Sequence, residues 1–230
     1  MLCYSSSGID VDKNLFLTMT TDRGLCGGIN STLSKYTRTL LNLTSDGEEK
    51  KLMVAIIGDK GRAQLQRDQG DQIVYTAADM AKVNLNFSVA SYVAEEVLKT
   101  QYDAVRILFN RFESAIKFTP TIVTVLSPEG LEKHVDANGK LDMYELEGPD
   151  RGELLQDLAE FQLVASVFSS LLDNQTSEMG ARMMAMDSSS RNAADMLEKL
   201  TLSYNRSRQA GITTELIEII SGAAALDDAK

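Results

Sequence analysis

Residues 152–226 read GELLQDLAEFQLVASVFSSLLDNQTSEMGARMMAMDSSSRNAADMLEKLTLSYNRSRQAGITTELIEIISGAAAL, and no proline interrupts them, because Pro149 is the last of three. The stretch predicts a single helix, roughly 110 Å long at 1.5 Å per residue. A small domain has no internal use for such a helix, since helices are stabilised mainly by packing. We therefore expect this chain to be part of a larger assembly.

An apolar seam follows this predicted helix. Steps of four and three residues from Leu154 to Ala210 meet twelve apolar residues at seventeen positions, whereas a chain that is 43% hydrophobic would give about seven. The spacing is typical of a left-handed coiled coil. The stripe is widened in its first third by Leu155, Val164, Val167 and Leu171, which predicts packing on the chain's own domain. The later seam is small or polar and favours a separate partner.

The end of the helix is apolar around nearly its whole circumference. Its apolar residues are Leu216, Ile217, Ile219, Ile220, Ala223, Ala224, Ala225 and Leu226. A helix of this kind must be enclosed, and we expect other proteins to enclose it. A membrane span is the alternative, but the apolar stretch is about half the roughly 20 residues a span needs and contains Glu215 and Glu218.

Composition excludes several classes of protein. The net charge of −10 argues against nucleic-acid binding, which concentrates Lys and Arg. Two cysteines give no disulfide framework, and neither a signal peptide nor a transmembrane run is visible.

The first 150 residues predict an α/β domain. Strands are expected at 14–20, 52–57, 73–75 and 104–109, with helices at 30–41, 59–67 and 86–98. This alternation predicts a small, parallel-sheet, Rossmann-like domain. Residues 116–126 alternate as a strand, and Asp136-Ala-Asn-Gly139 indicates a tight turn, so a hairpin is expected at the sheet edge. The predicted division is an α/β domain at 1–150 and a long helix at 151–230, with the hinge at 148–150.

No motif here indicates an enzyme, a cofactor or a metal. The turn at Gly24-Leu-Cys-Gly-Gly28 lacks the dinucleotide spacing, no P-loop occurs, and residues 58–61 are a weaker phosphate candidate still. His134 is the only histidine and reads as a solvated side chain. Cys26 lacks a base nearby in sequence, so a buried structural thiol is favoured over a nucleophile.

A polar cluster precedes the apolar end. Gln209 and Thr213 are four residues apart on one helix face, and Glu215 lies close by. A solvated face explains them, but a helix entering a protein sleeve must also satisfy its polar groups against the wall. The sequence leaves both interpretations open.

Two motifs resemble the gamma subunit of F-type ATP synthase. Residues 179–193, MGARMMAMDSSSRNA, and 202–225, LSYNRSRQAGITTELIEIISGAAA, resemble the family's C-terminal signature. Residues 21–30, TDRGLCGGIN, resemble its first strand-turn motif. The sequence MDSSSRNA at residues 186–193 resembles mitochondrial members of the family more than bacterial ones.

The resemblance implies a central rotor subunit without a catalytic group or cofactor. Its partners would be the alpha and beta subunits around the tip, and the delta and epsilon subunits and the c-ring at the foot. Turning with the proton-driven ring, it would cycle the conformations of the catalytic beta subunits. The implied location is the matrix side of the mitochondrial inner membrane, as a peripheral protein; the bacterial plasma membrane is the alternative.

The resemblance also assigns residues. Arg182, Gln209, Thr213 and Glu215 match contacts to a beta-subunit catch loop. The tip in its hydrophobic bearing comprises Arg208, Ile212, Leu216, Ile217, Ile219, Ile220, Ala223 and Leu226. Tyr144, Glu145 and Asp150 fall where the foot would meet the c-ring and the small rotor subunits.

One departure from the family stands out. Its members begin with a helix of some sixty residues that pairs with the C-terminal helix, and this sequence opens at Met1 shortly before the first strand. We expect a second helix along 172–210 in the assembly. The alternative function is an α/β enzyme with an oligomerisation helix, which should carry a polar pocket at the carboxyl ends of its strands.

Overall fold

The computed structural model describes residues 11–45, 50–138 and 150–227. The chain forms two compact units, Met1–Ala185 and Met186–Lys230, and the division falls within one helix, α5 (Arg151–Asp227). The first unit holds the sheet, the other helices and the beginning of α5. The second consists, among its described residues, of the rest of α5.

A five-stranded sheet in the order β3-β2-β1-β4-β5 organises the first unit. Its strands are β1 (Lys13–Met19), β2 (Lys51–Ile57), β3 (Ile73–Ala77), β4 (Ala104–Phe112) and β5 (Phe118–Leu126). The first four are parallel, and β5 runs antiparallel to β4 at the edge. In β1 Leu17 pairs with Ala55 on one side and Ile107 on the other, and all three side chains are buried. This confirms the predicted α/β fold with a mostly parallel sheet.

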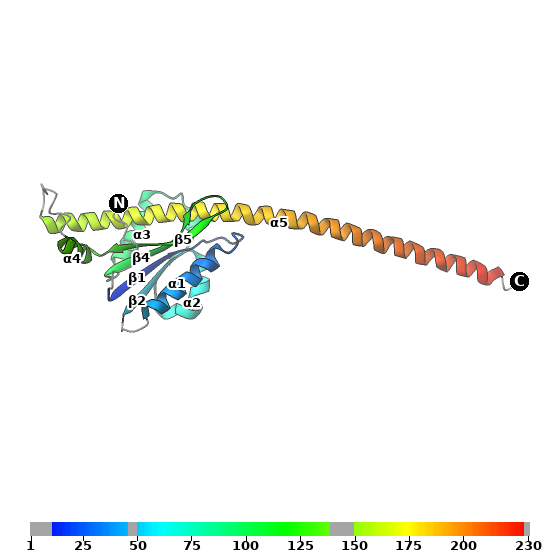
Figure 1. Ribbon diagram of the computed structural model, residues 1–230, viewed down its shortest axis with the longest axis horizontal. Coiled ribbons are helices and arrows are strands. Elements are labelled where there is room, and N and C mark those ends of the chain that lie inside the picture. The colour runs from blue at the N-terminus through cyan, green and yellow to red at the C-terminus, as the bar shows by residue number, and fades with distance from the viewer. Residues whose placement is uncertain (1–10, 46–49, 139–149, 228–230) are drawn as a thin grey trace. The chain divides into compact units, whose positions relative to one another are not determined.

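Helices cover both faces of the sheet (Figure 1). The helices α1 (Ile29–Ser45) and α2 (Asp59–Gln69) pack on the face that carries Phe16. The opposite face carries Leu15 and Leu17 and is covered by α3 (Phe87–Leu98) and by the beginning of α5. Two short 3-10 turns, Gly70–Gln72 and Met80–Lys82, flank β3.

The predicted turn at residues 136–139 was wrong. Residues Pro128–Asn138 form a helix, α4, and Gly139 lies outside the described residues. The cause is a helix start that the sequence already contains, because Ser127 caps α4 by accepting a hydrogen bond from the Gly130 amide at 3.2 Å and Pro128 takes the first helical position. The hairpin exists one element earlier, where β4 and β5 are joined through residues 113–117.

The beginning of α5 packs on the sheet, as predicted, but through the flank of the seam. Residues at steps of four are buried there: Leu155, Ala159, Leu163, Val167 and Leu171. Part of the seam stays exposed, since Leu158 is 44% exposed, Phe161 63% and Leu172 41%, whereas Phe168 is partly buried against the core. The chain's own sheet therefore buries the flanking stripe and leaves these three seam side chains exposed.

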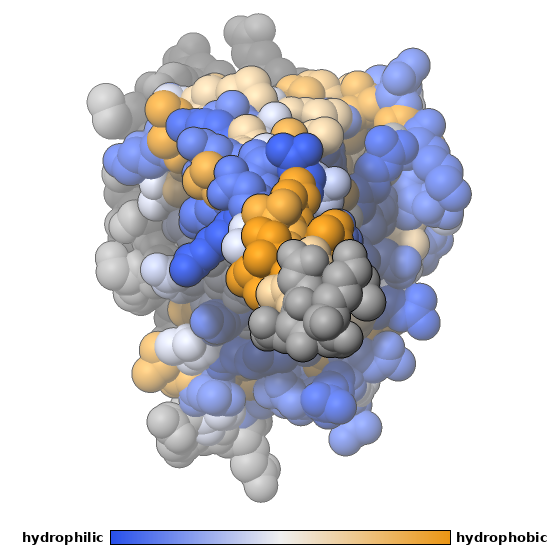
Figure 2. Space-filling view, turned by 90° about the vertical axis from the view of Figure 1, so that its right-hand side faces the viewer, coloured by the Kyte–Doolittle hydropathy of each residue, from blue (hydrophilic) through white to orange (hydrophobic). Residues whose placement is uncertain are grey.

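The second unit is an exposed helix. Every residue from Met186 to Ala225 is exposed. Its apolar side chains gather near the C-terminal end of α5 (Figure 2), where Ile217 is 56% exposed and Ile219 69%. No helix among the described residues is long and apolar enough to cross a membrane.

Candidate interaction surface

Polar side chains of α5 meet the carboxyl ends of the strands in the first unit. Asn174 Oδ1 accepts hydrogen bonds from the backbone amide of Asn110, at 3.4 Å, and from its side-chain amide, at 3.1 Å. Asn174 Nδ2 donates to the carbonyl of Thr20 at 3.5 Å, and Ser177 Oγ donates to the carbonyl of Asn110 at 2.9 Å. The sequence pattern did not single out these residues; the only signal is a pair of weak helix formers inside a long helix.

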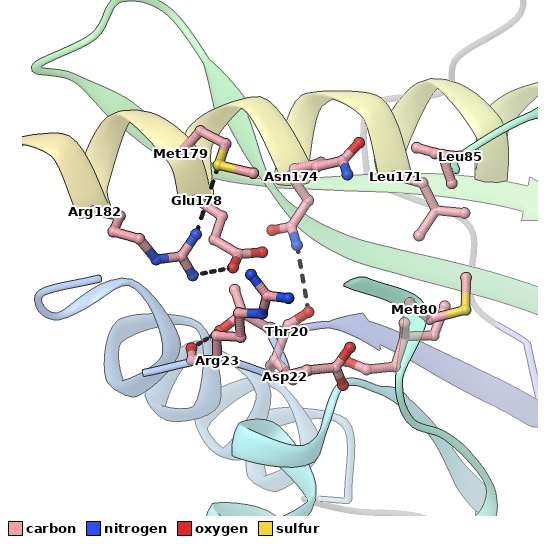
Figure 3. Close-up of a pocket in the computed structure, with 13 residues that line it drawn as sticks. Thr20, Asp22, Arg23, Met80, Leu85, Leu171, Asn174, Glu178, Met179 and Arg182 are labelled. Carbon is pink, nitrogen blue, oxygen red and sulfur yellow. Dashed lines mark hydrogen bonds and ion pairs between the residues drawn. The ribbon is translucent and has the colours of Figure 1, made fainter. Parts of the chain in front are cut away.

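One turn further along, an ion pair faces the same edge (Figure 3). The Arg182 guanidinium donates to Glu178 Oε1, and its other nitrogen lies 3.6 Å from the Met179 sulfur. Both charged side chains are largely covered, with 18% of Arg182 and 10% of Glu178 exposed. Arg182, one of the predicted catch-loop residues, is thus already paired within this chain.

A small cavity lies between this part of α5 and the sheet edge (Figure 3). It has a volume of about 70 Å³, and Thr20, Asp22, Arg23, Asn174 and Glu178 are among its lining residues. Sites for small ligands usually measure roughly 300 Å³ or more. In an open α/β sheet this edge is where a ligand would bind, and here α5 occupies it. The site expected of an α/β enzyme is therefore mostly filled by protein.

The loop at Gly58–Gly61 is closed by the chain's own hydrogen bonds. The Gly58 amide donates to the carbonyl of Ala77 at 2.8 Å, and the Lys60 amide donates to that of Thr21 at 3.0 Å. The Gly61 amide donates to Thr20 Oγ1 at 3.0 Å. Because these amides already donate hydrogen bonds within the chain, they are not available to bind a phosphate.

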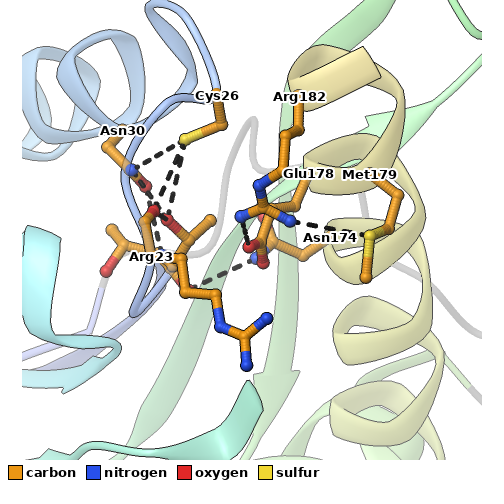
Figure 4. Close-up of polar contacts among 9 residues, drawn as sticks. Arg23, Cys26, Asn30, Asn174, Glu178, Met179 and Arg182 are labelled. Atoms are coloured by element: carbon orange, nitrogen blue, oxygen red, sulfur yellow. Dashed lines mark hydrogen bonds and ion pairs between the residues drawn. The ribbon is translucent and has the colours of Figure 1, made fainter. Parts of the chain in front are cut away.

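Cys26 is a buried thiol, as predicted, with 2% of its surface exposed. The Asn30 side-chain amide donates to its sulfur at 3.4 Å and to Thr21 Oγ1 at 2.8 Å (Figure 4). The thiol thus belongs to a small network that fixes the turn between β1 and α1.

His134 lies half-buried on α4 rather than in a solvated turn. In the described ranges no group of three His, Cys, Asp or Glu side chains could hold a metal.

A groove of about 660 Å³ opens at the opposite, amino-terminal edge of the sheet. It is lined by Tyr102, Asp103 and Glu160, among others. Burial raises the pKa of Tyr102 to about 12, and the charge of Glu160 adds to the shift. The phenol therefore keeps its proton in the folded chain at a pH where an unfolded tyrosine loses it.

This shift predicts an alkaline weakness of the fold. Between about pH 10 and 12 the unfolded state releases a proton that the folded state retains, so stability falls as pH rises through this window. Relative to Tyr102→Phe, the wild type should lose about 2 kcal/mol between pH 8 and 11.5. Urea unfolding at both pH values measures the difference. Tyr36→Phe, at an exposed tyrosine, is the control, and equal pH dependence of the wild type and Tyr102→Phe would contradict the prediction.

The other predicted contact residues lie apart from Arg182 in the sequence and in the second unit. Gln209, Thr213 and Glu215 are exposed, and so is Arg208, which the resemblance assigns to the tip. The Thr213 hydroxyl donates to the Gln209 carbonyl at 2.8 Å, so its oxygen still presents lone pairs to a partner.

The predicted tip and foot residues are placed as follows. The tip side chains from Ile212 to Ala223 are exposed, and Leu226 lies within α5. Asp150 is exposed, and its carbonyl accepts from the Leu154 amide at 3.1 Å at the start of α5. Tyr144 and Glu145 lie outside the described residues.

These features define an α/β protein with a long, exposed helix, in which the ligand-binding edge of the sheet is largely filled by the chain's own α5. A family model described as ATP synthase matches residues 4–226. The chain is 52% identical to the mitochondrial gamma subunit of ATP synthase from Arabidopsis thaliana, across 100% of this chain and 72% of the relative. Identity is 42% with the gamma chain of Paracoccus denitrificans, across 93% and 73%. The chain belongs to the ATP synthase gamma-subunit family.

Solved structures agree on the fold. A chain of the Euglena gracilis mitochondrial ATP synthase matches with a TM-score of 0.80 at 22% identity, covering 94% of this chain and 73% of that one. A chain in the central stalk and c-ring structure of Tetrahymena thermophila mitochondrial ATP synthase matches with a TM-score of 0.68 at 26% identity, covering 80% and 79%.

Proposed function

We propose that this chain is the central rotor subunit of a proton-translocating ATP synthase. The observation that carries the proposal is the exposed part of α5, an unbroken helix whose apolar end has no cover among the described residues. Water-exposed apolar surface of this extent is typical of an interface. The relatives are gamma subunits of ATP synthase, so the partners at that interface would be other subunits of this complex. The chain would transmit rotation and would carry no catalytic group itself.

Residues 1–150 would act as the foot and residues 151–230 as the shaft. The foot would rest on the c-ring and bind the delta and epsilon subunits, using Asp150 together with Tyr144 and Glu145. The shaft would turn inside the ring of alpha and beta subunits. A helical partner along residues 172–210, where the seam residues Leu172, Met186 and Leu200 are exposed, would complete the coiled coil.

The coupling step would depend on differential contacts. A helix with unlike faces presents a different surface to each beta subunit as it turns, and a rotor shifts a conformational equilibrium only by the difference in its binding energies. Gln209, Thr213 and Glu215 supply directional polar contacts to a catch loop. Arg182 would contribute while Glu178 holds its guanidinium in place. The apolar tip supplies a non-directional bearing.

The proposed location is the matrix side of the mitochondrial inner membrane, where the chain would be peripheral. Higher identity to plant mitochondrial gamma subunits, 52%, than to the bacterial gamma chain of Paracoccus denitrificans, 42%, supports the mitochondrial choice. The bacterial plasma membrane is the alternative.

Replacing Thr213 with leucine tests the proposal. We expect coupled ATP synthesis by the assembled complex to fall about tenfold, because a contact worth about 1.4 kcal/mol would be lost. The isolated chain should keep its helix content, since Thr213 is exposed. ATP synthesis in energised vesicles and circular dichroism measure the two effects.

Thr201→Leu is the matched control. Thr201 is also exposed on α5 and its hydroxyl donates to the Leu197 carbonyl at 2.8 Å, as Thr213 does to Gln209. Synthesis should therefore be nearly normal in this variant. Normal synthesis in Thr213→Leu, or equal losses in both variants, would remove the assigned role of Thr213.

A further inference from the structure

The buried face of α5 changes its chemistry as the helix crosses the sheet. From Leu155 to Leu171 it is apolar at every fourth residue. Beyond Leu171 the buried residues are polar, namely Asn174, Ser177 and Glu178. The change occurs where α5 reaches the carboxyl ends of the parallel strands.

The polar contacts connect α5 to the two central strands at once. Asn174 bonds to the Thr20 carbonyl, just after β1, and to Asn110 in β4, while Ser177 bonds to the Asn110 carbonyl. Asn110, Asn174 and Ser177 are 1%, 5% and 1% exposed. Because β1 and β4 are neighbours in the sheet, these bonds fix α5 to its middle rather than to an edge. We call Asn110, Asn174 and Ser177 the polar joint.

The hairpin between β4 and β5 adds a close backbone contact. A Cβ atom at Gly180 would lie 3.1 Å from the Ala115 carbonyl oxygen, which is tighter than ordinary van der Waals contact. Because Gly180 has no side chain, α5 can approach the hairpin closely just beyond Ser177 and Glu178.

Apolar and polar contacts resist motion differently. Apolar packing depends on buried area and has no preferred direction, so a helix held only by it can roll or slide at modest cost. Hydrogen bonds weaken steeply with angle, and a buried polar group that loses its partner is penalised. The polar joint therefore sets the rotation of α5 about its own axis.

We propose that the polar joint is the torque-bearing connection between the foot and the shaft helix. Asn110, Asn174 and Ser177 would act as positioning residues that keep α5 from turning against the sheet while the rotor is loaded. The inference rests on the proposed rotor function. The mechanical load would fall on three uncharged side chains whose hydrogen bonds join α5 to β4 and to Thr20, just after β1.

The test measures torsional stiffness in the assembled complex. With the alpha and beta ring fixed and a probe on the foot, Asn174→Leu should raise the angular variance of the probe about twofold or more, because three of the four directional bonds of the polar joint are lost and only the Ser177 bond remains. Ser177→Ala removes one hydrogen bond and only a hydroxyl oxygen, so the angular variance should rise less in this variant. Thr176→Val, on the exposed side of the same helix turn, should match the wild type.

The outcomes separate this inference from the rotor function. If a folded and assembled Asn174→Leu complex has the same angular variance as the wild type, the torque-bearing role of the polar joint is wrong. The proposed rotor function would still stand as long as the wild-type complex rotates. If Asn174→Leu does not assemble, Ser177→Ala decides, and unchanged variance there overturns the joint. Failure of the wild-type chain to support rotation would instead overturn the proposed function itself.

Discussion

Replacing Gly58 with alanine is expected to destabilise the α/β unit by about 4 kcal/mol, which is a large share of a typical domain's stability. Gly58 has φ of 99° and ψ of 138°, a conformation that side chains rarely adopt. A Cβ atom there would lie 2.7 Å from both the carbonyl carbon and the carbonyl oxygen of Thr20. Backbone atoms cannot turn aside as a flexible side chain can, so β1 or the start of α2 must move.

Urea unfolding of the purified chain measures this loss. Gly70→Ala is the matched control, because Gly70 has helical angles and nothing lies within 4 Å of the added Cβ atom. That change should be neutral or stabilise the chain by up to about 1 kcal/mol. If Gly58→Ala unfolds at the same urea concentration as Gly70→Ala, the close packing of Thr20 on this turn does not hold the unit together.

The sheet could be predicted from the sequence because its strands are short apolar runs between clear turns. The runs at 14–20, 52–57 and 104–109 became β1, β2 and β4 within a few residues, since a strand buried on both faces leaves a continuous apolar signal. The helix predicted at 86–98 became α3, and Ala90, Val93, Ala94 and Val97, which recur at helical spacing, are buried. Phe87 is 45% exposed, and its ring instead contacts that of Phe168, at 5.8 Å between centroids.

The errors arose where local and tertiary signals compete. Asp136-Ala-Asn-Gly139 has turn composition, but the cap at Ser127 and the buried side chain of Leu131 favour a helix through Asn138. The Ser-Pro pair at 127–128 was the available signal for that helix start. In α5 the widened first third correctly predicted packing on the chain's own sheet, because Leu155, Val167 and Leu171 are buried. The partner expected along the later seam stays a prediction.

The polar joint could not be predicted from one sequence. Asn174 and Ser177 have the composition of a solvated helix face, and their meaning depends on Thr20 and Asn110, which are 154 and 64 residues away from Asn174. Hydrogen bonds of that kind follow from the final packing, and periodicity does not contain them. The exposed apolar end of α5, in contrast, was predictable, because a helix that is apolar all round is visible in the sequence itself.

Changing Ile220 to glutamate is expected to reduce assembly of the rotor with the alpha and beta ring by more than about 100-fold. In the isolated chain Ile220 is 58% exposed, so the substitution should change the free energy of unfolding by less than about 0.5 kcal/mol. Inside an apolar sleeve the same carboxylate would lose its water and find no partner. A penalty of about 3 kcal/mol is a modest estimate for a buried, unpaired charge, and it corresponds to the stated loss.

Two comparisons sharpen this prediction. Leu202→Glu is the matched control, because Leu202 is 64% exposed on α5 but lies off both the seam and the apolar end. It should assemble nearly as well as the wild type in a titration monitored by analytical ultracentrifugation. Removal of residues 225–230 should also be tolerated, since a bearing held by non-directional contact loses little when its last turn is shortened. Full assembly of Ile220→Glu would mean that water, and not protein, surrounds this end of α5 in the working complex.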